Sequence, residues 1–281
     1  MRTGMTKFHG LDSVRLHTVE GGTTIVTTYG AHVVSWVPTG GDERIFLSGK
    51  SAMDKRAPIR GGVPIVFPQF ATYGPLPHHG LVRTRDWSIT EMGVGGEEAY
   101  VRLHIEDSVE TRQLWPHPFG CELTVTMSGA RLTLQLRIEN PGPAPLTFRA
   151  ALHTYLRVGD IRSVRLEGLH ASRYRDRTDN DQEVEDVAEA LTINGEVDRV
   201  YTDAPGSLVL REPGQTVTIH KDGFPDYVVW NPWKDKCSTL SDMATDAYEH
   251  MLCVEAAAVG RVLTLAKGET WVGSQSLLAA Q

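Results

Sequence analysis

Apolar and polar residues alternate with a period of two over much of this chain. In residues 121–140, Leu123, Val125 and Met127 alternate with polar residues, and the alternation resumes after small residues at 128–130. A period of two places every second side chain on one face of a strand, so this segment predicts a β-hairpin with one buried face. Shorter runs of the same kind cover residues 99–106, 208–219, 262–265 and 270–275, and residues 23–37 are rich in Thr, Val, Ile, Tyr and Trp, which favour strands.

Helical patterns are scarce. Residues 183–191 and 241–250 predict short helices, the second because Ser241 can cap it. The acid-rich residues 176–189 predict a solvated loop. Many short strands joined by Gly and Pro turns indicate a β-sandwich or barrel. Since no linker, repeat or low-complexity tract interrupts this pattern, we expect one domain over residues 1–281.

Composition narrows the classes of function. The 281 residues carry 28 Lys and Arg against 35 Asp and Glu, a net charge of −7, which argues against nucleic acid or an anionic membrane surface as a partner. No apolar run reaches the roughly 18 residues of a transmembrane helix, and the first ten residues lack the apolar core of a signal peptide. Cys121, Cys237 and Cys253 fit neither a zinc pattern nor a disulfide framework. We therefore expect a cytoplasmic protein whose thiols act as small hydrophobes.

A basic stretch at residues 54–86 stands out against this acidic background. It holds five Lys or Arg and two Asp, a local net charge of +3. Arginines beside tight-turn glycines suit a bound phosphate, because a guanidinium can grip two oxygens at once. A surface loop would explain any one of these arginines. The whole pattern, which includes His78 and His79, favours an anion site.

Two polar residues stand in apolar segments with strand character. His153 lies in residues 149–158 (RAALHTYLRV), and Glu255 lies in residues 251–258 (MLCVEAAA). Burying a carboxylate costs free energy unless it is paired or its proton is used. Burial also raises its pKa toward neutral pH, which suits a general base. His153 alone fits a core histidine as well as an acid–base residue.

Aromatic and acidic residues in the second half of the chain suit a sugar ligand. The turn at residues 230–233 (WNPW) carries tryptophans, which stack on sugar rings in some proteins and form ordinary core in others. Asp198 can accept hydrogen bonds from sugar hydroxyls or pair with Arg199. Residues 93–97 (GVGGE) predict a turn and no dinucleotide site, because no strand–helix frame surrounds them.

Several motifs occur together in one order. They are IRGGVPIVFPQF, PHHGLVRTRDW, ALHTYLRVGDI, EVDRVYTD and YVVWNPW, followed by SDMATDAYEHMLCVEAA. In this combination the chain resembles the hexose-6-phosphate mutarotase branch of the aldose 1-epimerase superfamily, over residues 11–277. The RGG-PxxFP form separates this branch from the galactose mutarotases.

The resemblance implies an all-β fold, a β-supersandwich of large twisted antiparallel sheets with its site on a concave face. It implies interconversion of the α and β anomers of an aldose, with neither metal nor nucleotide cofactor. His153 matches the general acid that protonates the ring oxygen, and Glu255 matches the base that takes the proton of the anomeric hydroxyl. The ring then opens, the C1–C2 bond turns, and the ring closes with the other configuration. The need for one acid and one base agrees with the residues themselves.

The resemblance also assigns substrate contacts. Arg60 and Arg83 match arginines that contact the substrate, and we expect them to hold its phosphate. Asp198 matches the acid that binds sugar hydroxyls, and His79 matches the histidine of the HG turn. His78, also expected to contact the substrate, stands where relatives often carry glutamine. The expected partner is a small sugar phosphate, bound by a monomer.

Three other functions compete with this prediction. An aldose 1-epimerase acting on free sugars needs the same acid and base, but the local charge of +3 favours a phosphorylated substrate. A non-catalytic carbohydrate-binding or regulatory sandwich has no need of His153 and Glu255 together. A glycoside hydrolase or lyase requires two catalytic carboxylates, and Glu255 is the one convincing buried carboxylate in the sequence.

Overall fold

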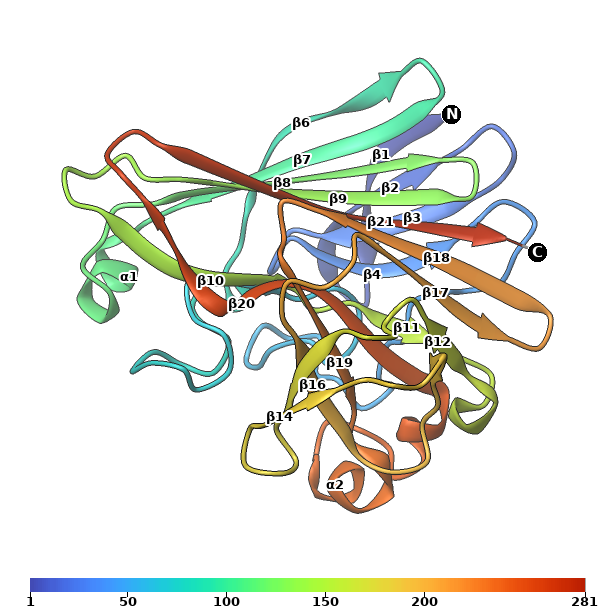
Figure 1. Cartoon of the computed structure of the whole chain (residues 1–281). Helices are drawn as coiled ribbons and strands as arrows, with labels where there is room; N and C mark the ends of the chain where they lie inside the picture. The colour runs from blue at the N-terminus through green and yellow to red at the C-terminus, as the bar shows by residue number, and fades with distance from the viewer. Residues whose placement is uncertain (281) are drawn as a thin grey trace.

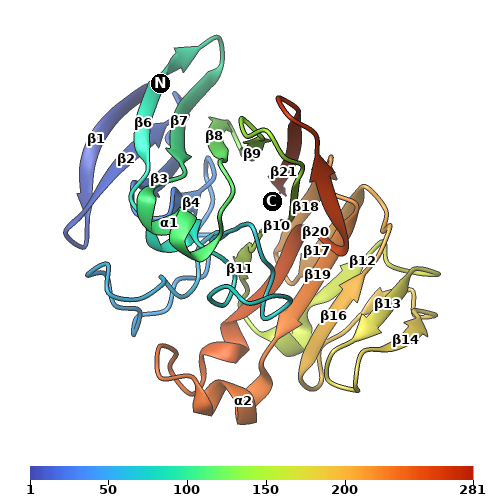
Figure 2. The same cartoon turned by 90° about the vertical axis from the view of Figure 1, so that its left-hand side faces the viewer.

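The chain folds into three antiparallel sheets, in a computed structural model that describes residues 1–280. The smallest sheet has the strand order β1-β2-β3-β4. Figure 2 shows it at one side of the molecule, next to the β6–β7 hairpin. Its strands are β1 (Arg2–Phe8), β2 (Leu11–His17), β3 (Thr23–Thr27) and β4 (His32–Val37).

The nine-stranded sheet has the order β15-β12-β17-β18-β21-β9-β8-β7-β6. Its strands are β6 (Ser88–Gly95), β7 (Glu98–Glu106), β8 (Gly120–Ser128), β9 (Arg131–Glu139), β12 (Arg165–Glu167), β15 (Ala190–Leu191), β17 (Ser207–Glu212), β18 (Gln215–Asp222) and β21 (Thr270–Ala280). The hairpin predicted at residues 121–140 is confirmed as β8 and β9, which pair from Gly120↔Glu139 to Ser128↔Arg131. Its alternate apolar side chains are fully buried, as a period of two requires.

The eight-stranded sheet has the order β14-β13-β16-β19-β20-β10-β5, with β11 also pairing with β20. Its strands are β5 (Ile65–Val66), β10 (Leu146–Leu152), β11 (Tyr155–Arg157), β13 (Arg173–Asp176), β14 (Gln182–Glu185), β16 (Val197–Tyr201), β19 (Asp226–Asn231) and β20 (Met251–Leu265). Figure 1 shows how the long β20 rises from the region of α2 and turns into β21, so that one hairpin joins the two large sheets.

One continuous apolar core lies between the sheets. It takes Leu16 from the small sheet, Leu134 from the nine-stranded sheet, and Leu252 and Val254 from the eight-stranded sheet. The expectation of an all-β sandwich of large antiparallel sheets is therefore confirmed. That the whole of residues 1–281 forms one domain stays a prediction.

The helices are short and differ from those predicted. They are α1 (Val109–Leu114), α2 (Trp233–Thr239) and the 3-10 helices η1 (Val82–Thr84), η2 (Ile161–Ser163) and η3 (Ala247–His250). No helix within residues 1–280 has the length and apolar character to cross a membrane.

Both predicted helices, and the predicted solvated loop, are wrong in part or whole. Residues 183–191 form β14 and β15, and β14 pairs with β13 as a hairpin inside the segment expected to be a loop. Helix propensity is a weak preference that strand pairing overrides. Of residues 241–250, only η3 is helical. Asp242 instead contacts the residues around the arginine turn, since its carbonyl accepts a hydrogen bond from Ser48 and its carboxylate one from Arg60.

Candidate active site

Strand β20 presents two different faces to the molecule. Leu252, Val254 and Ala256 belong to the main core, while Cys253 and Glu255 point the other way. Alternation along a strand produces this division. Residues on both faces of β20 are buried. The Glu255 side chain is therefore only 1 % exposed, even though it lies outside the main apolar core.

His153 lies at the break between β10 and β11, both of which pair with β20. Its backbone N–H donates to the Pro64 carbonyl at 3.0 Å, which holds the break in place. His153 Nε2 lies 3.3 Å from Glu255 Oε1. The second ring nitrogen of His153 and Glu255 Oε2 are buried with no hydrogen-bond partner among the described residues. The structure thus brings the predicted acid and base into direct contact.

Burial drives both members of this pair toward their neutral forms. Desolvation raises the pKa of Glu255 well above its usual value, and the negative charge of Asp198 adds to this. Desolvation likewise lowers the pKa of His153 well below its usual value, helped by the charges of Arg83 and Arg60. Both directions favour a neutral pair with its proton on Glu255. The pair still offers one proton donor and one proton acceptor.

His153 and Glu255 lie in a pocket of about 250 Å³. Strands β16, β19 and β20, helix α2 and the loop before η1 contribute to its wall. The lining residues are Phe70, Ala71, His78, His79, His153, Arg177, Asp198, Val228, Trp230, Lys236, Leu240 and Glu255. Five of the seven residues predicted from sequence are therefore together here, and Trp230 of the WNPW turn is with them.

The loop geometry of His79 fixes which nitrogen is free. Its backbone has a φ of 64°, and its Nδ1 accepts a hydrogen bond from the Ala71 N–H at 3.2 Å. The neutral ring therefore carries its hydrogen on Nε2 and can donate it. Burial lowers the pKa of His79, and the positive charge of Arg83 acts in the same direction. His78 is exposed at the pocket rim, with its ring centroid 4.0 Å from that of His79.

Asp198 reaches the pocket because β16 and β19 pair in register, with Asp198 opposite Trp230. Desolvation raises its pKa, against the opposing charge of Arg177. Arg177 Nη1 lies 3.8 Å from Asp198 Oδ1. The alternative pairing of Asp198 with Arg199 is wrong, since Arg199 instead lies 3.6 Å from the carboxylate of Asp186.

Arg60 and Arg83 lie next to the pocket without lining it. Arg60 donates to the Asp242 carboxylate and to the Tyr155 hydroxyl, each at 3.1 Å. Arg83 donates to the His78 carbonyl at 2.8 Å, and no carboxylate within residues 1–280 forms an ion pair with it. Burial lowers the pKa of Arg83 to about 10. A half-buried guanidinium without a counter-charge is a natural partner for an anion.

The glycines beside Arg60 have a structural reason. Gly61 and Gly62 have φ values of 98° and 69°, a region that L side chains avoid. A Cβ on Gly62 would come within 2.2 Å of His32 Nε2, which itself lies 2.8 Å from the Gly61 carbonyl oxygen. The turn therefore packs directly on a buried histidine, and this contact positions Arg60.

Sequence reasoning missed two cations of the pocket, Arg177 and Lys236. Arg177 follows β13 inside the acid-rich segment, where one arginine carries no signal of its own. Its backbone N–H donates to the Asp198 carbonyl at 2.8 Å. Lys236 lies on α2 and pairs with Glu196 at 2.6 Å. Only the pairing of distant strands brings these residues to the site.

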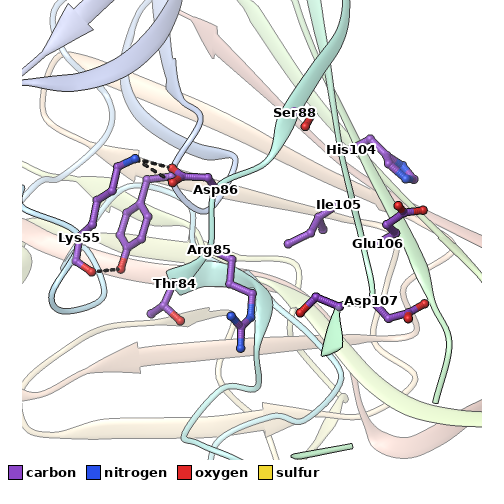
Figure 3. Close-up of a pocket in the computed structure, with 11 residues that line it drawn as sticks. Lys55, Thr84, Arg85, Asp86, Ser88, His104, Ile105, Glu106 and Asp107 are labelled. Carbon is purple, nitrogen blue, oxygen red and sulfur yellow. Dashed lines mark hydrogen bonds and ion pairs between the residues drawn. The ribbon is translucent and has the colours of Figure 1, made fainter. Parts of the chain in front are cut away.

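A larger hollow of about 630 Å³ lies elsewhere and contains none of the seven predicted residues. Figure 3 shows Lys55 turned onto Asp86 at one side and Glu106 and Asp107 at the other. Lys55 and Asp86 form an exposed ion pair at 2.7 Å. An ion pair that water can reach needs no ligand to satisfy it, so size alone does not identify the site.

One group of residues in the pocket also offers metal-ligand atoms. Atoms of His153, Cys253 and Glu255 lie within 4.8 Å of one another. His153 and Glu255 are the acid–base pair itself. Cys253 is buried as a free thiol, and burial raises its pKa well above the usual value.

The fold and the buried pair together define a β-sandwich protein of the mutarotase type. Comparison with known proteins agrees with this class. The family model for aldose 1-epimerase matches residues 12–278, and this chain belongs to that family. The epimerase class predicted from sequence is thereby confirmed.

Among curated proteins, the chain is similar to a "Putative glucose-6-phosphate 1-epimerase" of Cenchrus ciliaris. The two are 37% identical over 280 residues, covering 96% of this chain and 85% of the relative. A protein of the same name in Escherichia coli strain K12 is 29% identical over 256 residues, covering 90% of this chain and 85% of that relative.

Among solved structures, the chain resembles one described as a "putative mutarotase" from Salmonella typhimurium. The TM-score is 0.91 at 24% identity, covering 99% of this chain and 94% of that one. A "galactose mutarotase-like protein" from Clostridium acetobutylicum gives a TM-score of 0.77 at 14% identity, covering 100% and 99%. At these identities the likeness establishes the fold.

Proposed function

We propose that this protein interconverts the α and β anomers of a hexose 6-phosphate, glucose 6-phosphate in the first instance, without a cofactor. The observation that supports this most is the contact of 3.3 Å between His153 Nε2 and Glu255 Oε1 in a pocket with a cationic surround. The ring oxygen and the anomeric hydroxyl oxygen of a sugar are bonded to the same carbon. Two catalytic groups that serve them must therefore also lie close together.

The reaction moves one proton onto the sugar and one off it. Glu255, as carboxylate, takes the proton of the anomeric hydroxyl, and the C1–O5 bond breaks with its electron pair going to O5. His153, as imidazolium, protonates O5, which gives the open-chain aldehyde. Rotation about C1–C2 presents the other face of the carbonyl, and the reverse proton transfers close the ring. Each group ends in its starting state, so the pair needs no other proton source.

Sugar recognition falls to the rest of the pocket. Asp198 accepts hydrogen bonds from ring hydroxyls, and His79 donates one from Nε2, because its Nδ1 is already occupied by the Ala71 N–H. His78 contacts the substrate from the rim. Trp230 offers an aromatic face beside Asp198.

We assign the phosphate to Arg60 and Arg83. Arg83 is half-buried and has no carboxylate partner among the described residues, and the one carboxylate that Arg60 contacts, that of Asp242, pairs with no other cation there. A phosphate dianion would satisfy both guanidinium groups through charge-assisted hydrogen bonds. The two curated relatives, each named "Putative glucose-6-phosphate 1-epimerase", support this substrate class.

The test is anomer-exchange NMR on glucose 6-phosphate and on free glucose, at equal protein concentration. We expect faster exchange of the phosphorylated sugar. Faster exchange of free glucose would instead identify an aldose 1-epimerase acting on free sugars. Binding of glucose 6-phosphate with no acceleration of exchange would identify a non-catalytic sugar-phosphate-binding protein.

A further inference from the structure

The imidazole of His153 is one aromatic ring away from a guanidinium. The Tyr155 ring stacks on it, with centroids 4.8 Å apart and planes 10° apart. Arg60 Nη1 donates a hydrogen bond to the Tyr155 hydroxyl at 3.1 Å, and Arg60 Nε donates to Asp242 at 3.1 Å. Arg60 is therefore held in a fixed position relative to His153 by a buried ring.

Charged and titratable groups surround His153 unevenly. They comprise one carboxyl, one thiol, one phenol, two imidazoles and two guanidinium groups. The groups are Glu255 and Cys253 on β20, Tyr155 on β11, His78 and His79 in the loop before η1, Arg60 in the glycine turn and Arg83 on η1. An anion bound by Arg60 and Arg83 would offset positive charge that acts on His153.

The two members of the pair respond to different neighbours. Arg83 and Arg60, after burial, are the charges that lower the pKa of His153. Asp198 and Arg177 are the charges that act on Glu255. Neutralising the first two cations therefore favours protonated His153 without a matching effect on Glu255.

Building on the proposed function, we propose that the substrate's phosphate, by binding Arg60 and Arg83, drives one proton from Glu255 Oε1 to His153 Nε2. Tyr155 is the positioning residue between Arg60 and His153. The O–H bond of Glu255 breaks and leaves its electron pair on the carboxylate, while an N–H bond forms on His153. No proton enters or leaves the site. The phosphate thus converts the resting neutral pair into the imidazolium and carboxylate that ring opening requires.

This arrangement makes the phosphate more than an anchor. A free sugar would enter a pocket in which the proton is on Glu255, whereas ring opening requires it on His153. Its deficit would then appear in kcat and not only in KM, because the phosphate interaction is used to reach the reactive protonation state. Phosphate supplied as a separate molecule should restore part of that deficit.

The direct test is NMR of protein labelled with ¹⁵N-histidine, titrated with inorganic phosphate at fixed pH. We expect the two ring nitrogens of His153, assigned by their loss in His153→Gln, to change from the neutral to the doubly protonated pattern. A shift of one pKa unit changes the ratio of protonated to neutral His153 about tenfold. A His153 spectrum that stays neutral at saturating phosphate overturns the proposal.

A kinetic test uses D-xylose, which lacks carbon 6 and leaves room for a separate phosphate. We expect inorganic phosphate to raise the kcat of D-xylose anomer exchange about tenfold. Simple competitive inhibition by phosphate, with no activation at any concentration, overturns the proposal.

The role of Tyr155 is tested with Tyr155→Phe, which keeps the stacked ring and removes the hydroxyl that holds Arg60. Tyr100→Phe is the matched control, because it removes an exposed hydroxyl that donates to Glu91 far from the pocket. We expect Tyr155→Phe to bind phosphate but to lose most of the His153 protonation and of the xylose activation, and Tyr100→Phe to behave as wild type. Full protonation of His153 in Tyr155→Phe removes the role of Tyr155.

Failure of this proposal is distinct from failure of the proposed function. If glucose 6-phosphate exchanges no faster than glucose, the substrate assignment is wrong. If glucose 6-phosphate exchanges fast while phosphate leaves His153 neutral, the substrate assignment holds and only the proton transfer between Glu255 and His153 is wrong.

Discussion

Two hollows on this molecule both contain ionisable residues, but they differ in how far those residues are exposed to solvent. In the larger one, Lys55 and Asp86 are exposed and form an ion pair with each other. The smaller one, around His153 and Glu255, has ionisable groups that are buried and incompletely satisfied. Water and counter-charges hold exposed groups near their ordinary behaviour, whereas desolvation changes the proton affinity of buried ones. Burial therefore marks the candidate site better than volume does.

The largest expected effect comes from removing the buried pair of the smaller pocket. His153→Ala and Glu255→Gln should each lower the rate of anomer exchange roughly 10²- to 10⁴-fold, the range of general acid–base catalysis. Turnover by NMR at saturating glucose 6-phosphate measures the effect. Glu106→Gln, at the rim of the larger hollow, is the matched control and should retain wild-type turnover. An active double variant of His153 and Glu255 would remove the site from the smaller pocket.

The same contrast between buried and exposed ionisable groups explains which site residues could be predicted from the sequence. His153 and Glu255 could be recognised because each interrupts an apolar strand, where an ionisable group is costly. Arg177 and Lys236 could not, because each lies in a polar segment where a cation is ordinary. They reach the pocket through the pairing of β16, β19 and β20, which no local pattern encodes.

The fold was predictable where the period of two was long, and less so elsewhere. The β8–β9 hairpin has nine residues in each strand, and the alternation of apolar and polar residues predicts which face is buried. β14 and β15 have four residues and two, and their helix-like composition is overridden by pairing with β13 and β12. The helix that does form, α2, begins directly after Pro232 with an acidic residue in its first turn, a start signal that the aromatic residues around it obscured.

A second test concerns pH and the buried histidine under the arginine turn. Burial lowers the pKa of His32 from 6.5 to about 4. The unfolded chain therefore binds a proton below pH 6.5 that the folded chain refuses, so the stability contributed by neutral His32 is present above pH 6.5 and is lost as pH falls toward 4. Wild type should lose about 3 kcal/mol more than His32→Gln between pH 7 and pH 4.

Urea unfolding at several pH values measures this difference. His32→Gln is expected to be less stable than wild type at pH 7, so the slope against pH is the informative quantity rather than the absolute free energy. Parallel slopes for the two proteins would mean that His32 titrates normally and that its burial beneath Gly61 does not perturb it.

A third test sharpens the role of charge next to the small pocket. Arg60→Ala should weaken catalysis on glucose 6-phosphate roughly tenfold to a hundredfold, the scale of a hydrogen bond to a charged group. The same variant should lower kcat/KM for free glucose much less. Free glucose therefore serves as the control substrate for each protein. kcat/KM for both sugars, from anomer exchange, measures the difference. Equal losses on the two sugars would mean that Arg60 serves Tyr155 and Asp242 structurally and does not hold phosphate.

The smallest expected effect lies in the larger hollow. Lys55 pairs with Asp86 at 2.7 Å, with side chains 40% and 57% exposed. Exposed pairs of this kind contribute less than about 1 kcal/mol, because water and salt screen them. Lys55→Met keeps the aliphatic stem and removes the charge, so it should cost less than that in urea unfolding and leave anomer exchange unchanged. A large loss of activity in Lys55→Met, with stability intact, would mean that the larger hollow takes part in the reaction and that burial is not what distinguishes the two.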